Sequence, residues 1–277
     1  ETFTYTVSDG NGGTDTATIT VNASGQNDAP TAADNTVTTN EDTNHTFAAS
    51  EFNFTDVDGD SLDHISIETL PSNGTLLLSG NAVSAGDQIS VANISNLVFR
   101  PVANANGDDY DTFTFSVNDG TVDSGTYTMT IDVTAVNDAP LATDDADAVN
   151  EDATITESSG SELLVADDTD TDGNTLTVTQ IAITGGSNSS VTSSTTYSNG
   201  TSITGTYGTL TVGANGSYTY VADQSASDDL DASDPATDSF TYTISDGTTT
   251  DTATLIITVT GINDVPTASD NTVSTAE

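Results

Sequence analysis

The residues best suited to chemistry are the acids of the stretch VNDAPLATDDADAVNED, residues 136–152. Six of these seventeen positions are Asp or Glu, and none is basic. Two carboxylates about 4 Å apart near a protein surface repel each other by ~4 kcal/mol at an effective dielectric constant of ~20. Carboxylates gathered this densely therefore need a counter-charge if they are to stay together in a compact fold.

The whole chain has the same imbalance of charge. Its 277 residues include 43 acids and one base, Arg100, which gives a formal net charge of −42. Nucleic acids and anionic membrane surfaces would be repelled, and cations are the expected partners. There is no cysteine for disulfides and no lysine for lysine-based isopeptide bonds. No apolar run approaches the ~20 residues of a membrane span, so we expect no membrane insertion.

A repeated motif organises the chain. It occurs as ETFTYTVSDG (1–10), DTFTFSVNDG (111–120) and DSFTYTISDG (238–247). Each copy is followed by a second alternating run and then by QNDAP (26–30), VNDAP (136–140) or INDVP (262–266). A glutamate stands eleven residues after each of these prolines, at Glu41, Glu151 and Glu277. Repetition at this spacing predicts domain-sized units.

The repeated runs have the pattern of β-strands. Phe113, Phe115 and Val117 alternate with Thr and Ser, which places one apolar face inward and one polar face outward. Asn-Asp-Gly and Ser-Asp-Gly between paired runs are typical of hairpin turns. Short strands with frequent turns predict immunoglobulin-like sandwiches of about seven strands in ~100 residues, and they argue against disorder.

The repeats set the predicted boundaries, and the abrupt start of the chain suggests an excerpt from a longer protein. We expect the last strands of a partial repeat at 1–29, complete sandwiches at 30–139 and 140–265, and the first strand of a further repeat at 266–277. A Gly/Ser/Thr-rich insertion at 185–208 lengthens the second sandwich, as a long hairpin or as a mobile loop.

In such a sandwich the acids gather at both ends. One end has Asp56, Asp58 and Asp60 of FTDVDGDSL with Asp119 of the last hairpin turn, and the other has Glu41 and Asp42. Stacking the units end to end would bring a lower cluster, an Asn-Asp linker and an upper cluster together. Ca²⁺ accepts ~6–8 oxygen ligands and suits this surrounding better than Mg²⁺, which prefers to keep its waters. Zinc is not expected without cysteine.

Two other calcium motifs do not fit. Asp168, Asp170, Asp172 and Gly173 match the first half of an EF-hand loop, but Thr179 stands where its bidentate glutamate should be. The flanking residues also alternate as strands. The glycine-rich nonapeptide repeat is absent, because GNGGTD occurs once and not in tandem.

The Asn-Asp-Ala-Pro linker, the glutamate eleven residues later and the D-x-D loop together resemble the inter-repeat calcium scheme of cadherins. Residues 30–139 resemble bacterial cadherin-like repeats, above all in VFRPVANANGDDYDTFTFSVNDG (98–120). Residues 140–265 resemble the VCBS repeats of marine bacteria, in GTYGTLTVGANGSYTYVAD (205–223) and in 238–266. The resemblance covers essentially the whole chain. It implies antiparallel, immunoglobulin-like β-sandwiches joined end to end in a giant RTX-type surface adhesin.

The resemblance implies three calcium junctions. The first would use Asn27, Asp28, Asp56, Asp58 and Asp119. The middle one would use Glu41, Asp42, Asn137, Asp138, Asp170, Asp172 and Asp246, with Asp108, Asp109 and Asp111 as weaker candidates. The third would use Glu151, Asp152, Asn263 and Asp264. Cadherins usually have a further acid two residues before Asn-Asp, where this chain has Gly25, Ala135 and Gly261, so the number of ions per junction stays open.

The function expected from these features is that of a calcium-rigidified extracellular stalk at the cell surface. It would project a terminal binding module for adhesion or biofilm attachment, with neighbouring repeats as partners and a surface or glycan ligand elsewhere in the full protein. Catalysis is not expected, because the acids recur in exposed turns and a catalytic acid must be buried. Two alternatives stay open: a self-assembling fibre or surface layer joined by strand addition, and a carbohydrate-binding module that uses Tyr197 or Tyr207. Asp and Asn also form tight turns without metal.

Overall fold

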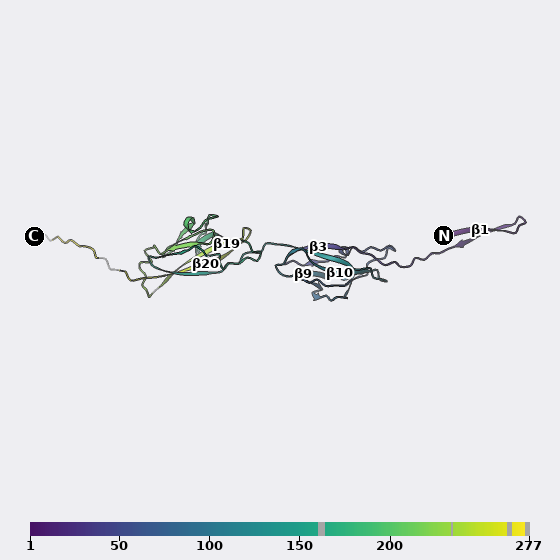
Figure 1. Cartoon of the computed structure of the whole chain (residues 1–277), viewed down its shortest axis with the longest axis horizontal. Coiled ribbons are helices and arrows are strands. Elements are labelled where there is room, and N and C mark those ends of the chain that lie inside the picture. Colours follow the sequence, from purple (N-terminus) through teal and green to yellow (C-terminus); the bar gives the residue numbers. More distant parts are fainter. Residues whose placement is uncertain (160–163, 234, 265–267, 275–277) are drawn as a thin grey trace. The chain divides into compact units, whose positions relative to one another are not determined.

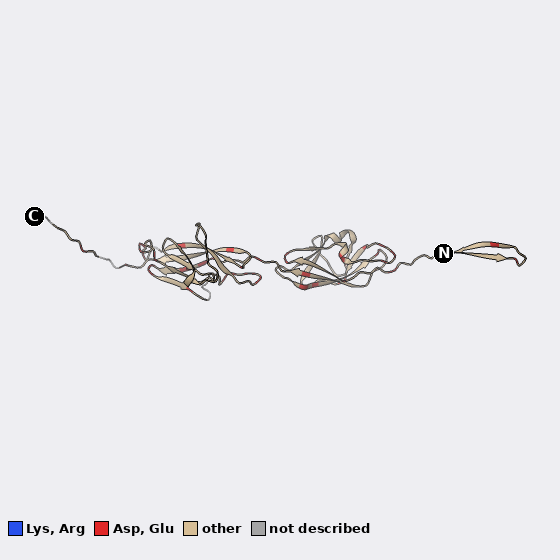
Figure 2. Ribbon diagram, turned by 90° about the horizontal axis from the view of Figure 1, so that it is seen from above, with Lys and Arg blue, Asp and Glu red and all other residues tan. Residues whose placement is uncertain are grey.

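A computed structural model describes residues 1–159, 164–233, 235–264 and 268–274. Strands dominate the described residues, and the predicted all-β class is confirmed. The chain divides into two compact units, Glu1–Val136 and Asn137–Glu277, which we call unit 1 and unit 2. Acidic residues occur on strands and in loops of both units (Figure 2). No helix among the described residues is long and apolar enough to cross a membrane.

Unit 1 contains a sandwich of two sheets (Figure 1). The five-stranded sheet has the order β3-β11-β10-β5-β8, with β3 Asn35–Asn40, β5 His64–Ile67, β8 Gln88–Ser90, β10 Gly107–Asn118 and β11 Tyr127–Thr134. The four-stranded sheet has the order β4-β9-β6-β7, with β4 His45–Thr46, β6 Gly74–Leu78, β7 Asn81–Ala82 and β9 Leu97–Pro101. Two 3₁₀ segments, η1 Ala49–Phe52 and η2 Val91–Asn96, connect them.

Unit 2 repeats this architecture. Its five-stranded sheet has the order β12-β20-β19-β14-β15, with β12 Asp145–Asn150, β14 Thr177–Ile183, β15 Ser189–Ser190, β19 Ala236–Ser245 and β20 Thr250–Thr260. Its four-stranded sheet has the order β13-β18-β17-β16, with β13 Thr154–Glu157, β16 Thr201–Thr204, β17 Thr209–Val212 and β18 Tyr218–Val221. The insertion 185–208 supplies β15, β16 and the 3₁₀ segment η4 Tyr197–Asn199. The described sheets contain more than the seven strands expected because short edge strands join them.

The alternating residues form the core between the two sheets of each sandwich. In unit 1 the core is rich in phenylalanine: the rings of Phe52 and Phe115 meet edge to face at a centroid distance of 4.9 Å, and those of Phe47 and Phe113 at 5.6 Å. Such pairs add about 0.5–1.5 kcal/mol to the free energy gained by burial. In unit 2, tyrosines take a large part of this role. Tyr218, Tyr220 and Tyr242 are buried with their hydroxyl groups hydrogen-bonded.

The first and last strands of each sandwich pair in parallel. Strand β3 pairs with β11 from Asn35 opposite Met129 to Asn40 opposite Thr134, and β12 pairs with β20 in the same way. The sequence predicted antiparallel sandwiches, and the remaining named strand pairs follow that prediction. The parallel pair arises because the chain crosses from one sheet to the other after its first strand, so its last strand lies beside its first.

Both ends of the chain carry parts of the repeat. Strands β1 (Thr2–Ser8) and β2 (Thr14–Thr20) form a hairpin, as predicted for the last strands of a repeat. Its apolar residues Phe3, Tyr5 and Val7 are about half exposed, whereas their counterparts in β10 are fully buried. The expected strand in 266–277 is absent from its described part, residues 268–274. In β3 and β12 the corresponding residues pair with the last strand of their own sandwich.

Candidate metal centre

We call Asp56, Asp58, Asp60 and Asp119 the upper cluster of unit 1, and Glu41 and Asp42 its lower cluster. The acids of the upper cluster lie in two loops of the sandwich and are hydrogen-bonded to the first Asn-Asp linker. The Asn27 side-chain amide donates to Asp119 Oδ2 at 2.8 Å and to the carbonyl oxygen of Asp28 at 2.9 Å. The Asp28 backbone N–H donates to Asp58 Oδ2 at 2.7 Å. The structure therefore brings together four of the five residues predicted for this junction through direct hydrogen bonds, and the fifth, Asp56, lies in the same loop as Asp58.

Tight turns set the positions of these carboxylates. Asp56 Oδ1 accepts the backbone N–H groups of Asp58 at 2.8 Å and Asp60 at 3.1 Å, and Gly59 between them has a positive φ of 82°. Asp119 Oδ1 accepts two backbone N–H groups of its own hairpin turn. The Asn27 amide and these N–H groups lower the pKa of Asp119. Both acids thus form turns, as Asp commonly does, and each keeps a second oxygen for other partners.

Unit 2 reproduces this arrangement in its own upper cluster. The Asn137 amide donates to Asp246 Oδ2 at 2.8 Å, and the Asp138 N–H donates to Asp172 Oδ2 at 2.8 Å. The Asn174 N–H donates to Asp170 Oδ1 at 3.0 Å. The Asn137 amide is also the largest cause of the strongly lowered pKa of Asp246. The recurrence shows that the linker and the two loops are one structural feature.

The lower cluster of each unit is centred on a buried glutamate. Glu41 is only 3% exposed; its Oε1 accepts the Val136 N–H at 2.6 Å and its Oε2 accepts the Asn106 amide at 3.0 Å. These two donors, Asn106 first, lower the pKa of Glu41. Asp42 follows in the left-handed region, with φ of 56°, and accepts the Asn104 N–H at 3.1 Å.

The lower cluster of unit 2 has fewer donors. Glu151 is 2% exposed and its Oε1 accepts the Ile262 N–H. Asp152 has a φ of 59°, like its counterpart Asp42. The Asn263 amide donates to the carbonyl oxygen of Asp264 at 3.1 Å. That the lower cluster of one unit joins the upper cluster of the next remains a prediction.

Three buried carboxylate oxygens at predicted ligand positions have no hydrogen-bond partner among the described residues. Asp56 Oδ2, Asp170 Oδ2 and Glu151 Oε2 are inaccessible to water and accept no hydrogen bond. Burying an ionised oxygen without a partner is costly, whereas a hard cation would satisfy it. Carboxylate oxygens of Asp56, Asp58 and Asp60 also lie within 4.8 Å of one another. Arg100 is exposed on β9 and pairs with no described acid, so no arginine or lysine neutralises these clusters. The residues therefore fit Ca²⁺.

One weaker candidate has a structural role instead. Asp111 is 6% exposed, and its carboxylate accepts the backbone N–H groups of Ser72 at 3.0 Å and Asn73 at 2.6 Å. Its counterpart Asp238 holds a loop of unit 2 in the same manner. The first acid of the repeated motif thus anchors a turn. Asp109 has a φ of 48° and donates its N–H to Asp132, outside both clusters.

The structure also groups acids that the sequence prediction missed. We call Asp144, Asp145, Asp167, Asp168 and Asp251 the flank cluster of unit 2. Asp145 accepts the Tyr242 hydroxyl at 2.7 Å, and Asp168 accepts the Thr143 N–H at 2.8 Å while its Oδ2 has no partner. Burial, opposed by those hydrogen bonds, raises the pKa of Asp145 and of Asp168 to about 6. The signal available in the sequence was the Asp-Asp pairs at 144–145 and 167–168.

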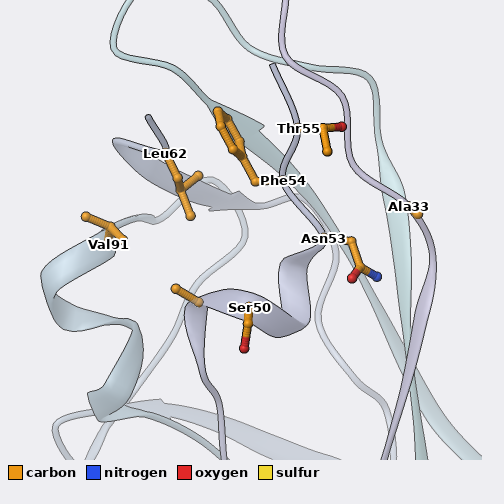
Figure 3. Close-up of a pocket in the computed structure, with 8 residues that line it drawn as sticks. Ala33, Ser50, Asn53, Phe54, Thr55, Leu62 and Val91 are labelled. Atoms are coloured by element: carbon orange, nitrogen blue, oxygen red, sulfur yellow. The ribbon is translucent and has the colours of Figure 1, made fainter. Parts of the chain in front are cut away.

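The same part of unit 1 keeps one of these acids, Asp34, which accepts the Thr128 N–H as Asp144 accepts the Thr254 N–H. Thr55 bridges Thr31 as Thr169 bridges Leu141, so Phe54 occupies the place of Asp168. Figure 3 shows Phe54, Leu62 and Val91 around an open groove of about 800 Å³. An apolar groove in unit 1 thus corresponds to carboxylates in unit 2.

Comparison with protein families gives two matches. Residues 137–261 match the bacterial cadherin-like domain, and residues 1–22 and 27–133 match the bacterial Ig domain. The predicted resemblance to bacterial cadherin-like repeats is confirmed, although the match falls on unit 2. The resemblance of 140–265 to VCBS repeats stays a prediction. No curated protein sequence matches the chain.

Solved structures with similarity to this chain include animal cadherins and a glycoside hydrolase. Drosophila N-cadherin EC1-4 is 13% identical with a TM-score of 0.43, over 86% of this chain and 50% of that chain. Mouse cadherin-23 EC22-24 is 14% identical with a TM-score of 0.42, over 94% and 74%. An endo-fucoidan hydrolase of glycoside hydrolase family 107 is 18% identical with a TM-score of 0.28, over 95% and 34%. The chain thus spans about a third of that hydrolase.

Proposed function

We propose that this chain is an extender segment of a large extracellular bacterial adhesin, stiffened by Ca²⁺ at its Asn-Asp linkers. The observation that carries the proposal is the set of water-inaccessible, unpartnered oxygens on Asp56, Asp170 and Glu151. Each lies in a cluster predicted from the repeat, and the chain has a single base. The match to cadherin-like and Ig domains supports an adhesion-type role.

The residues of this chain would hold the ion in two ways. The upper cluster supplies carboxylates already oriented by turn N–H groups and by the Asn27 or Asn137 amide. The lower cluster supplies Glu41 or Glu151, which are buried beside the chain as it leaves the last strand. Bound Ca²⁺ would supply positive charge that offsets carboxylate repulsion and would cross-link the linker to the loops. Extracellular modules bind Ca²⁺ with dissociation constants of ~10⁻⁴–10⁻³ M, so binding would follow export.

Calcium titration of the whole chain by calorimetry tests the binding, with Asp170→Asn and Asp56→Asn as variants. We expect each variant to lose binding at its own cluster while its far-UV circular dichroism is unchanged. Small-angle scattering with calcium and with EGTA tests the stiffening. A maximum dimension that does not change would contradict the stalk role even if calcium binds.

A further inference from the structure

The two lower clusters share a sequence motif and differ in how their buried glutamates are hydrogen-bonded. One oxygen of each glutamate accepts a backbone bond of the same kind, from the Val136 N–H to Glu41 and from the Ile262 N–H to Glu151. The second oxygens differ. Glu41 Oε2 accepts the side-chain amide of Asn106 at 3.0 Å, whereas Glu151 Oε2 is inaccessible to water and has no partner among the described residues. Unit 1 therefore satisfies its glutamate without a cation.

The donors of unit 1 come from the short connection between β9 and β10, residues 102–106. Asn104 has a left-handed backbone with φ of 57°, and its N–H donates to Asp42 at 3.1 Å. Two residues later, the Asn106 amide donates to Glu41. One connection thus supplies a neutral donor to each acid of the lower cluster.

The matching connection of unit 2 is longer, residues 222–235, and makes a different contact. It approaches the chain just after β20 so closely that a Cβ atom on Gly261 would lie 2.2 Å from the Leu230 carbonyl oxygen. Among its described residues, none donates a hydrogen bond to Glu151 or Asp152. Unit 2 therefore has no counterpart of the Asn106 amide in the part of the chain that the structure describes.

A cation and the Asn106 amide would compete for the same oxygen of Glu41. Ca²⁺ binds carboxylate oxygens directly, and the amide N–H points its positive end at the place where such an ion would lie. Binding through Glu41 Oε2 therefore requires this hydrogen bond to break. Glu151 Oε2 has no such bond to lose.

We propose that Asn106 sets the calcium dependence of the lower cluster of unit 1, because it completes the hydrogen bonding of Glu41 without metal and thereby lowers its affinity for Ca²⁺. This role rests on the proposed function, which takes Ca²⁺ as the ion that both glutamates bind. Unit 1 then keeps its lower cluster formed at low calcium, whereas unit 2 depends on the cation. A chain that contains both kinds of unit responds to calcium over a wider range of concentrations than a chain of one kind.

Calcium titration of the full chain, followed by ¹H–¹⁵N NMR, tests the competition. The Val136 and Ile262 N–H groups donate to the two glutamates and so report on each site separately. We expect Asn106→Ala to move the midpoint at Val136 to about tenfold lower calcium, because a hydrogen bond to a charged group is worth about that factor. The midpoint at Ile262 should not change. An unchanged or raised midpoint at Val136 would overturn the proposal.

Asn44→Ala is the matched control for this titration. Asn44 is an exposed asparagine three residues after Glu41, and its side chain forms no hydrogen bond with the described residues. Its replacement removes an amide beside the same cluster and should move neither midpoint. If Asn44→Ala shifts the Val136 midpoint as much as Asn106→Ala does, the effect does not come from the bond to Glu41 and the proposal fails.

Urea unfolding in EGTA tests the same role without metal. We expect Asn106→Ala to lower the midpoint of unit 1, and to lower it less when Glu41 is already replaced by Gln, because the hydrogen bond to a charged acceptor is the stronger one. Glu151→Gln removes a buried charge without a partner and should raise the midpoint of unit 2. An equal cost of Asn106→Ala with and without the Glu41 carboxylate would show that the amide does not act through Glu41.

The two measurements separate this inference from the function beneath it. If calcium shifts both amides but Asn106→Ala leaves the Val136 midpoint in place, calcium binding stands and the competition is wrong. If millimolar calcium shifts neither amide, the proposed calcium function fails and the competition with it, while the unfolding experiment in EGTA still decides whether Asn106 completes Glu41.

Discussion

The two sandwiches share one topology and build their cores from different aromatic residues. Unit 1 contains all but one of the eight phenylalanines, whereas unit 2 contains five of the eight tyrosines. Phe115 of unit 1 corresponds to Tyr242 of unit 2 in the repeated motif. Where Phe115 packs against Phe52, Tyr242 donates its hydroxyl to Asp145 at 2.7 Å.

This difference shows how buried carboxylates can be stabilised in a chain that has only one basic residue. In unit 2, Tyr218, Tyr220 and Tyr242 donate to Asp147, Asp238 and Asp145 at the margins of the core. Burial is the main cause that raises the pKa of all three tyrosines, so the hydroxyls stay protonated as donors. Unit 1 has Asn35 and Val37 at the positions of Asp145 and Asp147, and its Asp111, at the position of Asp238, accepts backbone N–H groups in place of a tyrosine hydroxyl. Neutral donors thus do in unit 2 what arginine and lysine do in most proteins.

Of the substitutions that test this difference between the units, replacement of the buried Asp238 in unit 2 should have the largest effect on the free energy of unfolding. Asp238 accepts the Thr206, Tyr207 and Gly208 N–H groups and the Tyr220 hydroxyl. Asp238→Ala leaves these buried donors without an acceptor, and we expect it to cost about 3–5 kcal/mol in the free energy of unfolding. Asp111 accepts two backbone N–H groups of a distant loop, those of Ser72 and Asn73, where Asp238 accepts three and a tyrosine hydroxyl, so Asp111→Ala should cost about 2–3 kcal/mol. Urea unfolding of the full chain measures both; equal costs would contradict the ranking.

Exchanging the paired aromatic residues should have the next largest effect. Tyr242→Phe removes the donor of Asp145, and Phe115→Tyr buries a hydroxyl where unit 1 has Asn35 instead of that acid. We expect each to cost about 1–3 kcal/mol. Adding Asn35→Asp to Phe115→Tyr should recover part of the loss. If the double variant is no more stable than the single one, the hydroxyl–carboxylate pairing is not what distinguishes the cores.

Lowering the pH from 7.5 to 5.5 should stabilise unit 2 through two acids whose pKa values are raised. Asp145 and Asp168 of unit 2 have folded-state pKa values of about 6, above the ordinary value of 3.8, so the folded state binds protons more tightly than the unfolded state. In EGTA, unit 2 therefore gains stability as the pH falls through about 6 toward 4. Glu41 and Asp119 of unit 1 have lowered pKa values, so their contribution is present above pH 4–5 and is lost on acidification.

The measurement is the denaturant midpoint of each unit at pH 7.5 and 5.5, with Asp145→Asn as the control. Protonation also lowers the general repulsion in both units, so the informative quantity is the difference between the chain and this variant. We expect Asp145→Asn to stabilise unit 2 at pH 7.5 and to change it less at pH 5.5. A variant effect that does not depend on pH would exclude titration of Asp145 in this range.

The two units should differ least in the calcium affinity of their upper clusters. Asp56 and Asp170 occupy matching positions, and each has one oxygen without a partner. Asp56→Asn and Asp170→Asn should therefore weaken calcium binding by similar factors, each at its own cluster, as measured by calorimetric titration. A loss at one cluster alone would show that the matching hydrogen bonds do not imply matching binding.

Much of the fold and of the candidate site could be predicted because both depend on short patterns. Alternation of Phe113, Phe115 and Val117 placed a strand with its buried face, and Asn118-Asp119-Gly120 placed the following turn. The recurrence of Asn-Asp with D-x-D predicted the contacts of Asn27 with Asp119 and of Asp28 with Asp58. Repetition helped because the same motif occurs in both units, so an assignment made in one unit could be checked in the other.

The remainder depends on contacts between residues far apart in sequence. Asp111 was predicted as a weaker calcium ligand, whereas its carboxylate is buried against the loop at Ser72 and Asn73, which carries no distinguishing sequence pattern. The flank cluster needs Asp145, at the start of β12, and Asp168, in the loop before β14, to lie near each other. The parallel pairing of β3 with β11 was missed for the same reason, since alternation fixes which face is buried but not which strand lies beside it.

The parallel pair also governs how each unit can complete its folding. Asp34 and Thr128, which begin the pair, are separated by 94 residues, so most of the unit must be available before its first strand finds its last. Contacts between residues this far apart in the sequence form slowly, because the entropy cost of closing a long loop comes before the contacts stabilise the fold. During synthesis each unit would therefore stay incomplete until its last strand is available, so the sandwich closes only when nearly its whole length has been made.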